Sequence, residues 1–161
     1  MSTRSASLVF FCLFALAGCS ATITPPEEGA GTVRLVGPAD VSVPVAVEFA
    51  RTPEEHQRGL QGRTSLVYGN GMLFLFEDSA VRSFWMKDTL LPLDIAFFDA
   101  EGRFVSQASM VPCPPEEGAA CPSTLSTGPA QFALEVPAGF LKAAGVEEGW
   151  NLVLGPWAAS E

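Results

Sequence analysis

The sequence predicts a mainly β domain, and two observations support this fold class. Short apolar segments recur along the chain between turns that contain glycine or proline, and most of them are too short for a stable helix. Several of these segments are rich in β-branched and aromatic residues, which favour strands. We therefore expect an antiparallel β-sandwich or a partly closed barrel with one or two short helices.

The first predicted elements are two strands and a helix. Residues 32–36 and 43–49 are β-branched and partly alternating, which predicts strands on either side of a Gly-Pro turn. A helix is expected from Thr52 to about Gln61. Its start has a threonine at the N-cap, a proline at the first helical position and two acids in the first turn. His56 is expected to be a solvated residue on the surface of this helix.

The later elements are mostly strands. Each apolar segment lies between residues that form turns, and its length is typical of a strand. One brief helix is expected over residues 140–144, because Gly145 can end it. The further predicted strands cover residues 72–76, 83–86, 93–98, 104–110, 131–136 and 152–154.

The N-terminus has the pattern of a bacterial lipoprotein signal. Arg4 provides a positive start, residues 8–17 are almost wholly apolar, and small residues precede Cys19 as in a lipobox. The apolar run is about ten residues long, whereas a membrane-spanning helix needs roughly 20. We expect the signal, residues 1–18, to be removed and Cys19 to carry the lipid.

This signal defines the expected organisation and location of the chain. Residues 19–31 contain the lipidated cysteine and a small, polar tether rich in proline, glycine and glutamate, and residues 32–157 form one domain. Acyl chains on Cys19 would anchor the protein to a bacterial membrane. The domain is expected in the cell envelope, facing the periplasm or the exterior.

Charge and motifs narrow the expected partners. The chain has 9 basic and 18 acidic residues and a net charge of −9. Loss of the signal removes one basic residue and no acid, which makes the net charge −10. Nucleic acid is therefore disfavoured as a partner. The sequence contains no GxSxG, Walker, HExxH or dinucleotide-binding motif, and no cofactor is expected.

Two cysteines are available for a disulfide. Cys12 would leave with the signal and Cys19 would be acylated, so only Cys113 and Cys121 remain. Export places them in a compartment where disulfides persist, and a single bridge between them is expected. A metal site is not expected, because one histidine and the absence of a CxxC motif leave too few zinc ligands.

Two acidic residues interrupt apolar segments and indicate either internal ion pairs or a site. Buried Asp94 and Glu135 would need partners, and Arg63 or Lys87 could pair with Glu135. In the first interpretation these four residues form structural ion pairs at a sheet edge, with Trp85 as core filler. In the second, Trp85 forms a flat apolar wall of a shallow site and the charged residues orient a small polar ligand.

Several short motifs together resemble the family of domain of unknown function 192 (DUF192). The resemblance runs in order from about residue 45 to residue 153 and includes the specific Trp-Met-Lys and Pro-Leu-Asp motifs. It implies a compact antiparallel sandwich or barrel of jelly-roll type with a short helix after the second strand, and no established activity. The motifs are Thr52-Pro53-Glu54-Glu55, Arg58-Gly59-Leu60, Gly71-Met72-Leu73-Phe74, Phe84-Trp85-Met86-Lys87-Asp88-Thr89, Pro92-Leu93-Asp94 and Leu134-Glu135-Val136.

The resemblance also has local implications. Envelope members of the family look similar around the cysteine pair, which supports the bridge between Cys113 and Cys121. Gln61 replaces a methionine that is usual in the family, Asp88 replaces an asparagine, and Trp150 replaces an aspartate. The charge on Asp88 can change the preference of any site near that turn.

Three functions are compatible with these observations. The leading hypothesis is a lipid-anchored binding or accessory module for a small polar ligand or an envelope protein. The alternative is a hydrolase-like enzyme that uses Asp94 and Glu135 as an acid/base pair. The third possibility is a purely structural envelope protein.

Overall fold

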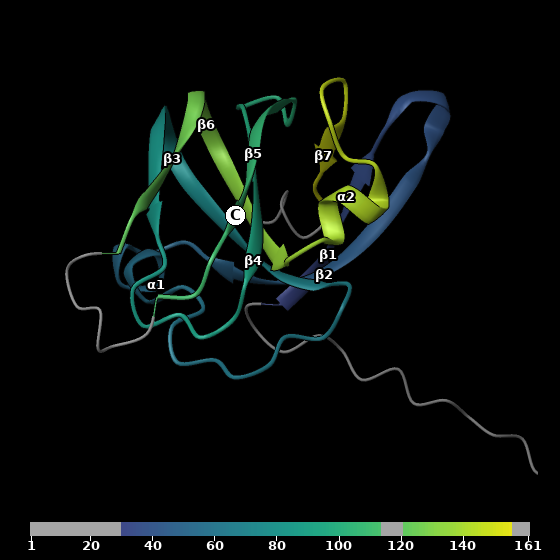
Figure 1. The fold of residues 1–161 in the computed structure, drawn as a ribbon. Helices are drawn as coiled ribbons and strands as arrows, with labels where there is room; N and C mark the ends of the chain where they lie inside the picture. Colours follow the sequence, from purple (N-terminus) through teal and green to yellow (C-terminus); the bar gives the residue numbers. More distant parts are fainter. Residues whose placement is uncertain (1–29, 114–120, 156–161) are drawn as a thin grey trace, which may run out of the picture.

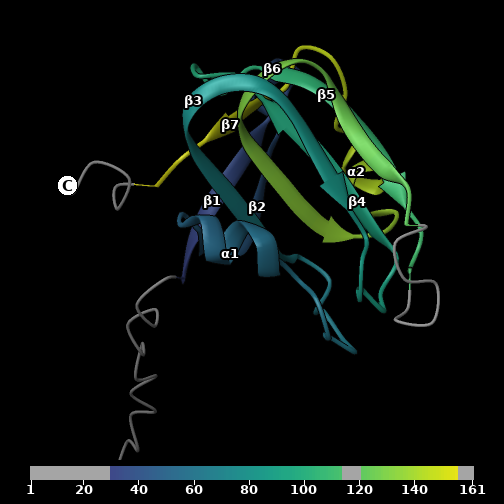
Figure 2. The same ribbon diagram turned by 90° about the vertical axis from the view of Figure 1, so that its left-hand side faces the viewer.

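Seven strands form a single sheet in the computed structural model, which describes residues 30–113 and 121–155. The order of strands across the sheet is β5-β4-β6-β3-β2-β1-β7. Figures 1 and 2 show that the sheet curls strongly into a half-barrel. The mainly β prediction is confirmed, and the architecture is the partly closed barrel. The elements are β1 (Ala30–Val36), η1 (Pro38–Asp40), β2 (Ser42–Ala50), α1 (Pro53–Arg58), β3 (Asn70–Trp85), β4 (Leu93–Phe98), β5 (Phe104–Met110), β6 (Ser123–Pro137), α2 (Phe140–Ala144) and β7 (Asn151–Val153).

One pair of neighbouring strands departs from the antiparallel pattern. β2 and β3 are parallel, with Ala46 opposite Asn70 and Ala50 opposite Phe74. Parallel neighbours need a crossover connection, and the segment that contains α1 provides it. β3 continues to Trp85 after this ladder ends. Within the described residues, the second half of β3 thus has a strand partner on one side only, and the candidate site lies beside its other edge.

The longest strand joins two segments that the sequence separates. β3 has 16 residues and covers both predicted strands, 72–76 and 83–86. A register shift between Leu75 and Ala80 marks a bulge opposite β6. The residues in the bulge are mostly polar and exposed, so they interrupt the apolar pattern without ending the strand.

Other element boundaries follow the local sequence closely. β4, β5 and α2 have the predicted bounds, whereas β6 begins at Ser123 instead of Gln131. The predicted start of α1 is confirmed by a capping box in which Thr52 and Glu55 each bond to the backbone of the other. The helix ends at Arg58, earlier than predicted, because Gly59 takes a φ of 46°.

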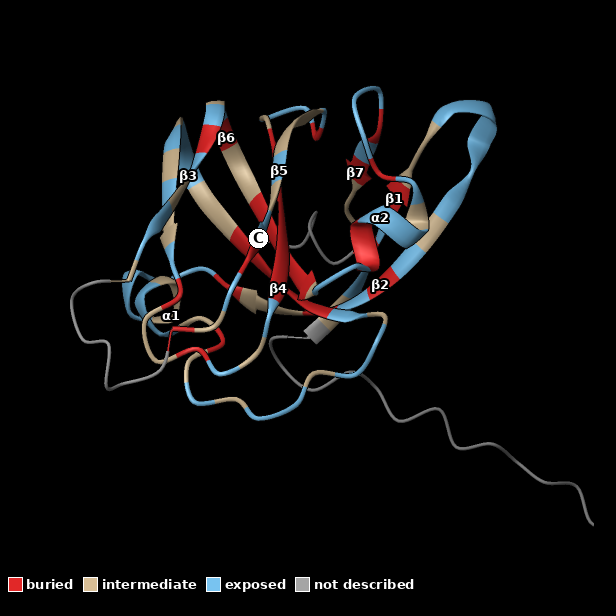
Figure 3. Ribbon diagram, in the orientation of Figure 1, coloured by how far each residue is buried: buried red, intermediate tan, exposed pale blue. Residues whose placement is uncertain are grey.

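Apolar residues pack on both faces of the sheet. β4 is buried along its whole length, and Figure 3 shows it in red. Neighbouring residues of a strand point to opposite faces. Accordingly Ala96 and Phe98 join a cluster with α2 and Trp150, while Ile95 and Phe97 join a second cluster on the other face. The candidate site is on this second face.

The predicted disulfide is present between Cys113 and Cys121, whose Cα atoms are 5.8 Å apart. The backbone N–H of Cys113 donates a hydrogen bond to the carbonyl oxygen of Thr89 at 3.1 Å. The bridge therefore lies beside the turn that follows β3. Cys19 and the predicted signal, residues 1–18, lie outside the described residues. No helix within residues 30–113 and 121–155 combines the length and apolarity needed to cross a bilayer.

Candidate ligand-binding site

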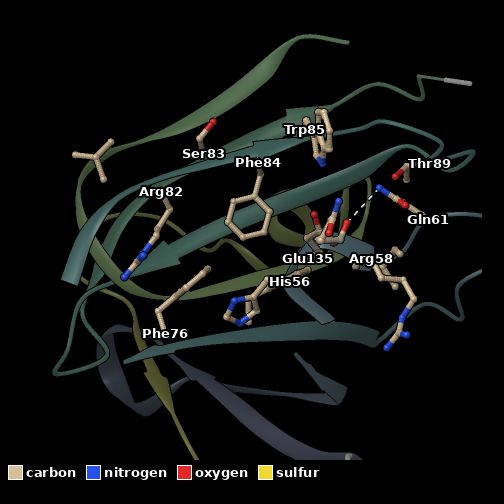
Figure 4. A pocket seen from close by; sticks show the side chains of 15 residues that line it. His56, Arg58, Gln61, Phe76, Arg82, Ser83, Phe84, Trp85, Thr89 and Glu135 are labelled. Carbon is tan, nitrogen blue, oxygen red and sulfur yellow. Dashed lines mark hydrogen bonds between the residues drawn. The ribbon is translucent and has the colours of Figure 1, made fainter. Parts of the chain in front are cut away.

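A cavity of about 360 Å³ lies between α1, the second half of β3 and β6. Its lining includes six consecutive residues from His56 to Gln61, five from Val81 to Trp85, and Glu135. Figure 4 shows the labelled side chains around this space. The site is assembled from three elements that are distant in sequence, because the crossover after β2 carries α1 along the unpaired edge of β3.

Glu135 is the buried acidic residue of this cavity. It lies on β6 opposite Met72 of β3 and Ile95 of β4, and only 4% of its surface is exposed. Among the described residues no hydrogen bond or ion pair reaches its carboxyl group, and since no fully buried side-chain oxygen there lacks a partner, the carboxyl oxygens are accessible from the cavity. Burial without a compensating charge raises the pKa of Glu135 to about 8. The group therefore holds its proton at neutral pH and can donate a hydrogen bond into the cavity.

Aromatic side chains form much of the cavity wall. The rings of Phe74 and Phe84 meet edge to face, with centroids 4.8 Å apart, and Phe84 also contacts Phe76 edge to face at 6.3 Å. Trp85 is 46% exposed, so it is not the core filler of the first interpretation. It supplies an apolar surface at the edge of the cavity.

His56 corrects the expectation of a solvated surface residue. It is half-buried, and its Nε2 atom lies 3.0 Å from the carbonyl oxygens of both Ala50 and Leu75. Carbonyl oxygens only accept hydrogen bonds, so Nε2 carries a proton and donates. The ring also packs on Phe76, with centroids 4.4 Å apart. His56 thus links β2 to β3 where their ladder ends, which a helix surface position on its own does not reveal.

The arginines of the cavity are engaged elsewhere. Arg82 stacks over Phe76, with its guanidinium carbon 3.9 Å from the ring centroid. Its Nε donates to the carbonyl oxygen of Ala130 at 2.9 Å, and its guanidinium pairs with Asp78 at 2.8 Å. Arg58 is exposed and close enough to Glu55 to help lower the pKa of that carboxyl, after the hydrogen bonds from the Arg51 and Thr52 backbone. Neither arginine neutralises Glu135.

The structure brings together only part of the predicted site set. Trp85 and Glu135 line the same cavity. Arg63 forms a bidentate pair with Glu48, and Lys87 pairs with Asp88 at 3.0 Å. The prediction that Arg63 or Lys87 pairs with Glu135 is therefore wrong. Lys87 still lies near the site, because its Nζ is 5.8 Å from the centroid of Trp85.

Asp94 belongs to a different environment. Its carboxylate accepts hydrogen bonds from Ser109 Oγ at 2.7 Å and from the backbone N–H groups of Gly139 and Leu141 at 2.8 and 3.3 Å. Asp94 is opposite Val136 in the ladder, so its side chain and that of Glu135 leave the sheet on opposite faces. This geometry does not support an acid/base pair of these two residues.

Several lining residues were not identified from the sequence as members of a site. They include Phe74 and Phe76, which lie in a predicted strand, and Arg82, which comes directly before the next predicted strand. Gln61, which departs from the family pattern, also lines the cavity, and its Nε2 donates a hydrogen bond to the Gln57 carbonyl oxygen at 3.2 Å. The described residues contain no cluster of three or more His, Cys, Asp or Glu side chains suited to a metal ion.

The curled sheet places a cavity beside the free edge of β3, and within the described part of the chain the buried acid without a partner in this cavity is Glu135. The chain belongs to the DUF192 family, described as "Uncharacterized ACR", whose model matches residues 36–154. No curated protein matches the chain.

Solved structures that are similar to this chain include two crystal structures. One is of a Sinorhizobium meliloti protein provisionally described as a transcription regulator. It is 31% identical, with a TM-score of 0.69, and the match covers 79% of this chain and 96% of that one. The other is of a Novosphingobium aromaticivorans protein of unknown function. It is 27% identical, with a TM-score of 0.71, and the match covers 89% of this chain and all of that one. Both similarities extend over the described domain and assign no chemistry to it.

Proposed function

We propose that this chain is a lipid-anchored protein of the bacterial cell envelope, and that its DUF192 domain binds a small ligand in the cavity between Trp85 and Glu135. The observation that carries the binding proposal is the Glu135 carboxyl group, which is buried, unpaired among the described residues and faces a cavity. No fully buried side-chain oxygen or nitrogen of the described residues lacks a partner, so the Glu135 carboxyl is open to the cavity and a ligand can reach it. A bound ligand that contacts this group would supply the missing partner.

The shape of the site favours a small molecule over a protein surface. A cavity of about 360 Å³ has the size of a small-molecule site, and its lining combines aromatic rings with polar side chains that can orient a ligand. The half-exposed Trp85 gives a ligand a flat surface for stacking. The side chains of His56, Gln61 and Arg82 donate hydrogen bonds to backbone carbonyl oxygens. The Glu135 carboxyl has no partner among the described residues and can orient the ligand.

The envelope location rests on the sequence signal that ends at Cys19. A Cys19→Ala variant tests it, with Cys12→Ala as the matched control inside the signal. We expect the unaltered chain and the control to incorporate an alkyne-tagged fatty acid and to sediment with membranes. The Cys19 variant should do neither. Equal labelling of the Cys19 variant would disprove the anchor.

The binding proposal is tested by a thermal-shift screen of the purified chain against small polar metabolites. Hits should stabilise the unaltered chain and lose most of this effect in Trp85→Ala. Tyr68→Ala is the control, because Tyr68 is also an exposed aromatic residue but does not line the cavity. Hits that are insensitive to Trp85→Ala, or a screen without any hit, would count against a ligand site in this cavity.

A further inference from the structure

The basic side chains that line the cavity have hydrogen bonds, ion pairs or solvent to stabilise them, whereas the acidic side chain of Glu135 has no partner among the described residues. From α1, His56 and Arg58 face the site, and from β3 Arg82 does so. Beside Glu135, β4 presents Ile95 and Phe97, neither of which titrates. His56 donates to two carbonyl oxygens, Arg82 is paired with Asp78, and Arg58 is exposed to solvent near Glu55. The one ionisable group in the interior without a partner among the described residues is an acid.

The aromatic side chains of the cavity wall also favour a positively charged ligand. Aromatic rings carry negative charge on their faces and attract positive groups. Two cations of the chain already use rings at this site, since Arg82 stacks on Phe76 and Lys87 approaches Trp85. The net charge of −9 would further raise the local concentration of cations and oppose anions. An anionic ligand would be opposed by the net charge of the protein and could not form an ion pair with Glu135.

We infer that the ligand of this cavity is an organic cation with an alkylated ammonium group, held between the aromatic walls and the Glu135 carboxylate. This inference rests on the proposed binding function and specifies its ligand class. Alkyl groups on the nitrogen contact the rings, while the positive charge pairs with the carboxylate of Glu135, a residue that is only 4% exposed.

Binding of such a cation must be coupled to release of a proton. The empty site holds Glu135 protonated at neutral pH, because burial raises its pKa to about 8. The bound cation favours the carboxylate, so the proton of the carboxyl group passes to solvent as the ion pair forms. Below this pKa the affinity should rise about tenfold for each pH unit, which amounts to about 50-fold between pH 6 and pH 8.

The decisive experiment is calorimetric titration of the purified chain with choline and with its uncharged isostere, the alcohol in which carbon replaces the quaternary nitrogen. At pH 8 we expect choline to bind at least about tenfold more tightly than the isostere. Only the affinity for choline should show the 50-fold pH dependence. Both comparisons use the unaltered chain, so they do not depend on the folding of any variant.

A pair of variants then tests the role of Glu135. Glu135→Gln keeps the shape of the side chain but cannot ionise, and it should lose both the preference for choline and most of the pH dependence. Glu101→Gln removes an exposed acid that pairs with Arg103 in the turn between β4 and β5, outside the cavity lining, and should retain both.

The outcomes separate the two proposals. Equal binding of choline and the isostere would overturn the cation inference and leave the proposed ligand-binding function intact. If choline fails to bind while the metabolite screen yields neutral or anionic hits, the cation inference is likewise overturned and the ligand-binding function stands. Tight choline binding that is unchanged in Glu135→Gln would also overturn the inference, because the charge would then be recognised elsewhere.

Discussion

Asp94 and Glu135 lie one position out of register on adjacent strands, and their carboxyl groups leave the sheet on opposite faces. The two side chains are almost equally buried, with 3% and 4% of the residue exposed. Asp94 accepts three hydrogen bonds from Ser109, Gly139 and Leu141. Glu135 has none within the described residues and faces a cavity. The two residues are equally buried, but only Asp94 has hydrogen bonds that compensate for its burial. Asp94 therefore has a structural role, and Glu135 is the candidate functional group.

The stability of the folded chain should depend on pH through Glu135. The carboxyl pKa is raised from 4.5 to about 8 in the folded state, so the folded state binds more protons than the unfolded state between these values. The contribution of Glu135 to the free energy of unfolding should therefore be highest below about pH 4.5 and should fall as the pH rises towards 8. Denaturant titrations of the unaltered chain and of Glu135→Gln measure this effect.

Glu135→Gln should become the more stable protein as the pH rises. The difference in the free energy of unfolding should grow between pH 5 and pH 8 to several kcal/mol, at about 1.4 kcal/mol for each unit of pH, and then level off. A difference that does not vary with pH would show that Glu135 is ionised in the folded protein or is paired.

Removal of the Asp94 carboxylate should destabilise the fold. Asp94→Ala leaves three donors near α2 without their acceptor, and we expect a loss of about 2–4 kcal/mol in the free energy of unfolding. Ser109→Ala removes only one of these bonds and should cost about 1 kcal/mol. Urea denaturation measures both. A loss no larger in Asp94→Ala than in Ser109→Ala would contradict the bridging role of Asp94.

His56 should stabilise the junction between β2 and β3. His56→Phe keeps an aromatic ring against Phe76 but removes the donor to Ala50 and Leu75, with an expected loss of about 1–3 kcal/mol. Gln57→Ala, at the next and exposed position, should change stability by less than about 0.5 kcal/mol. Thermal denaturation distinguishes them, and equal melting temperatures would restore the view of His56 as a surface residue.

The disulfide should contribute modestly to stability. Cys113 and Cys121 are 8 positions apart, so closure of this short loop corresponds to about 2.5 kcal/mol in the unfolded state. The double variant Cys113→Ser, Cys121→Ser should lose about this amount and still fold, because most of the core lies elsewhere. A reductant should lower the melting temperature of the unaltered chain and leave that of the double variant unchanged. Sensitivity of the double variant to reductant would point to another cause.

Local patterns predicted most of the secondary structure. β4, β5 and α2 have the predicted bounds, because each is a short apolar segment between clear turn residues. The capping box of α1 was also predictable, since its donors and acceptors lie within four residues of each other. β3 was divided in two because a bulge of exposed polar residues resembles a turn in sequence while the ladder with β6 continues.

The site was only partly predictable. Glu135 and Asp94 stood out together because both interrupt apolar segments, and the sequence gives no means to assign them to different environments. Their separation depends on the register of β4 with β6. The sequence allows Arg63 to pair with Glu135, but in the structure Arg63 pairs with Glu48.

The sequence by itself determined the mainly β character, the helix starts and the pairing of Cys113 with Cys121, because these depend on residue type and on neighbours along the chain. Tertiary structure alone decided that β2 and β3 run parallel and that the sheet curls. These two features bring α1, the free edge of β3 and Glu135 of β6 around one cavity. The physical reason is that a strand's pattern fixes which residues share a face, whereas strand order and register fix what that face meets.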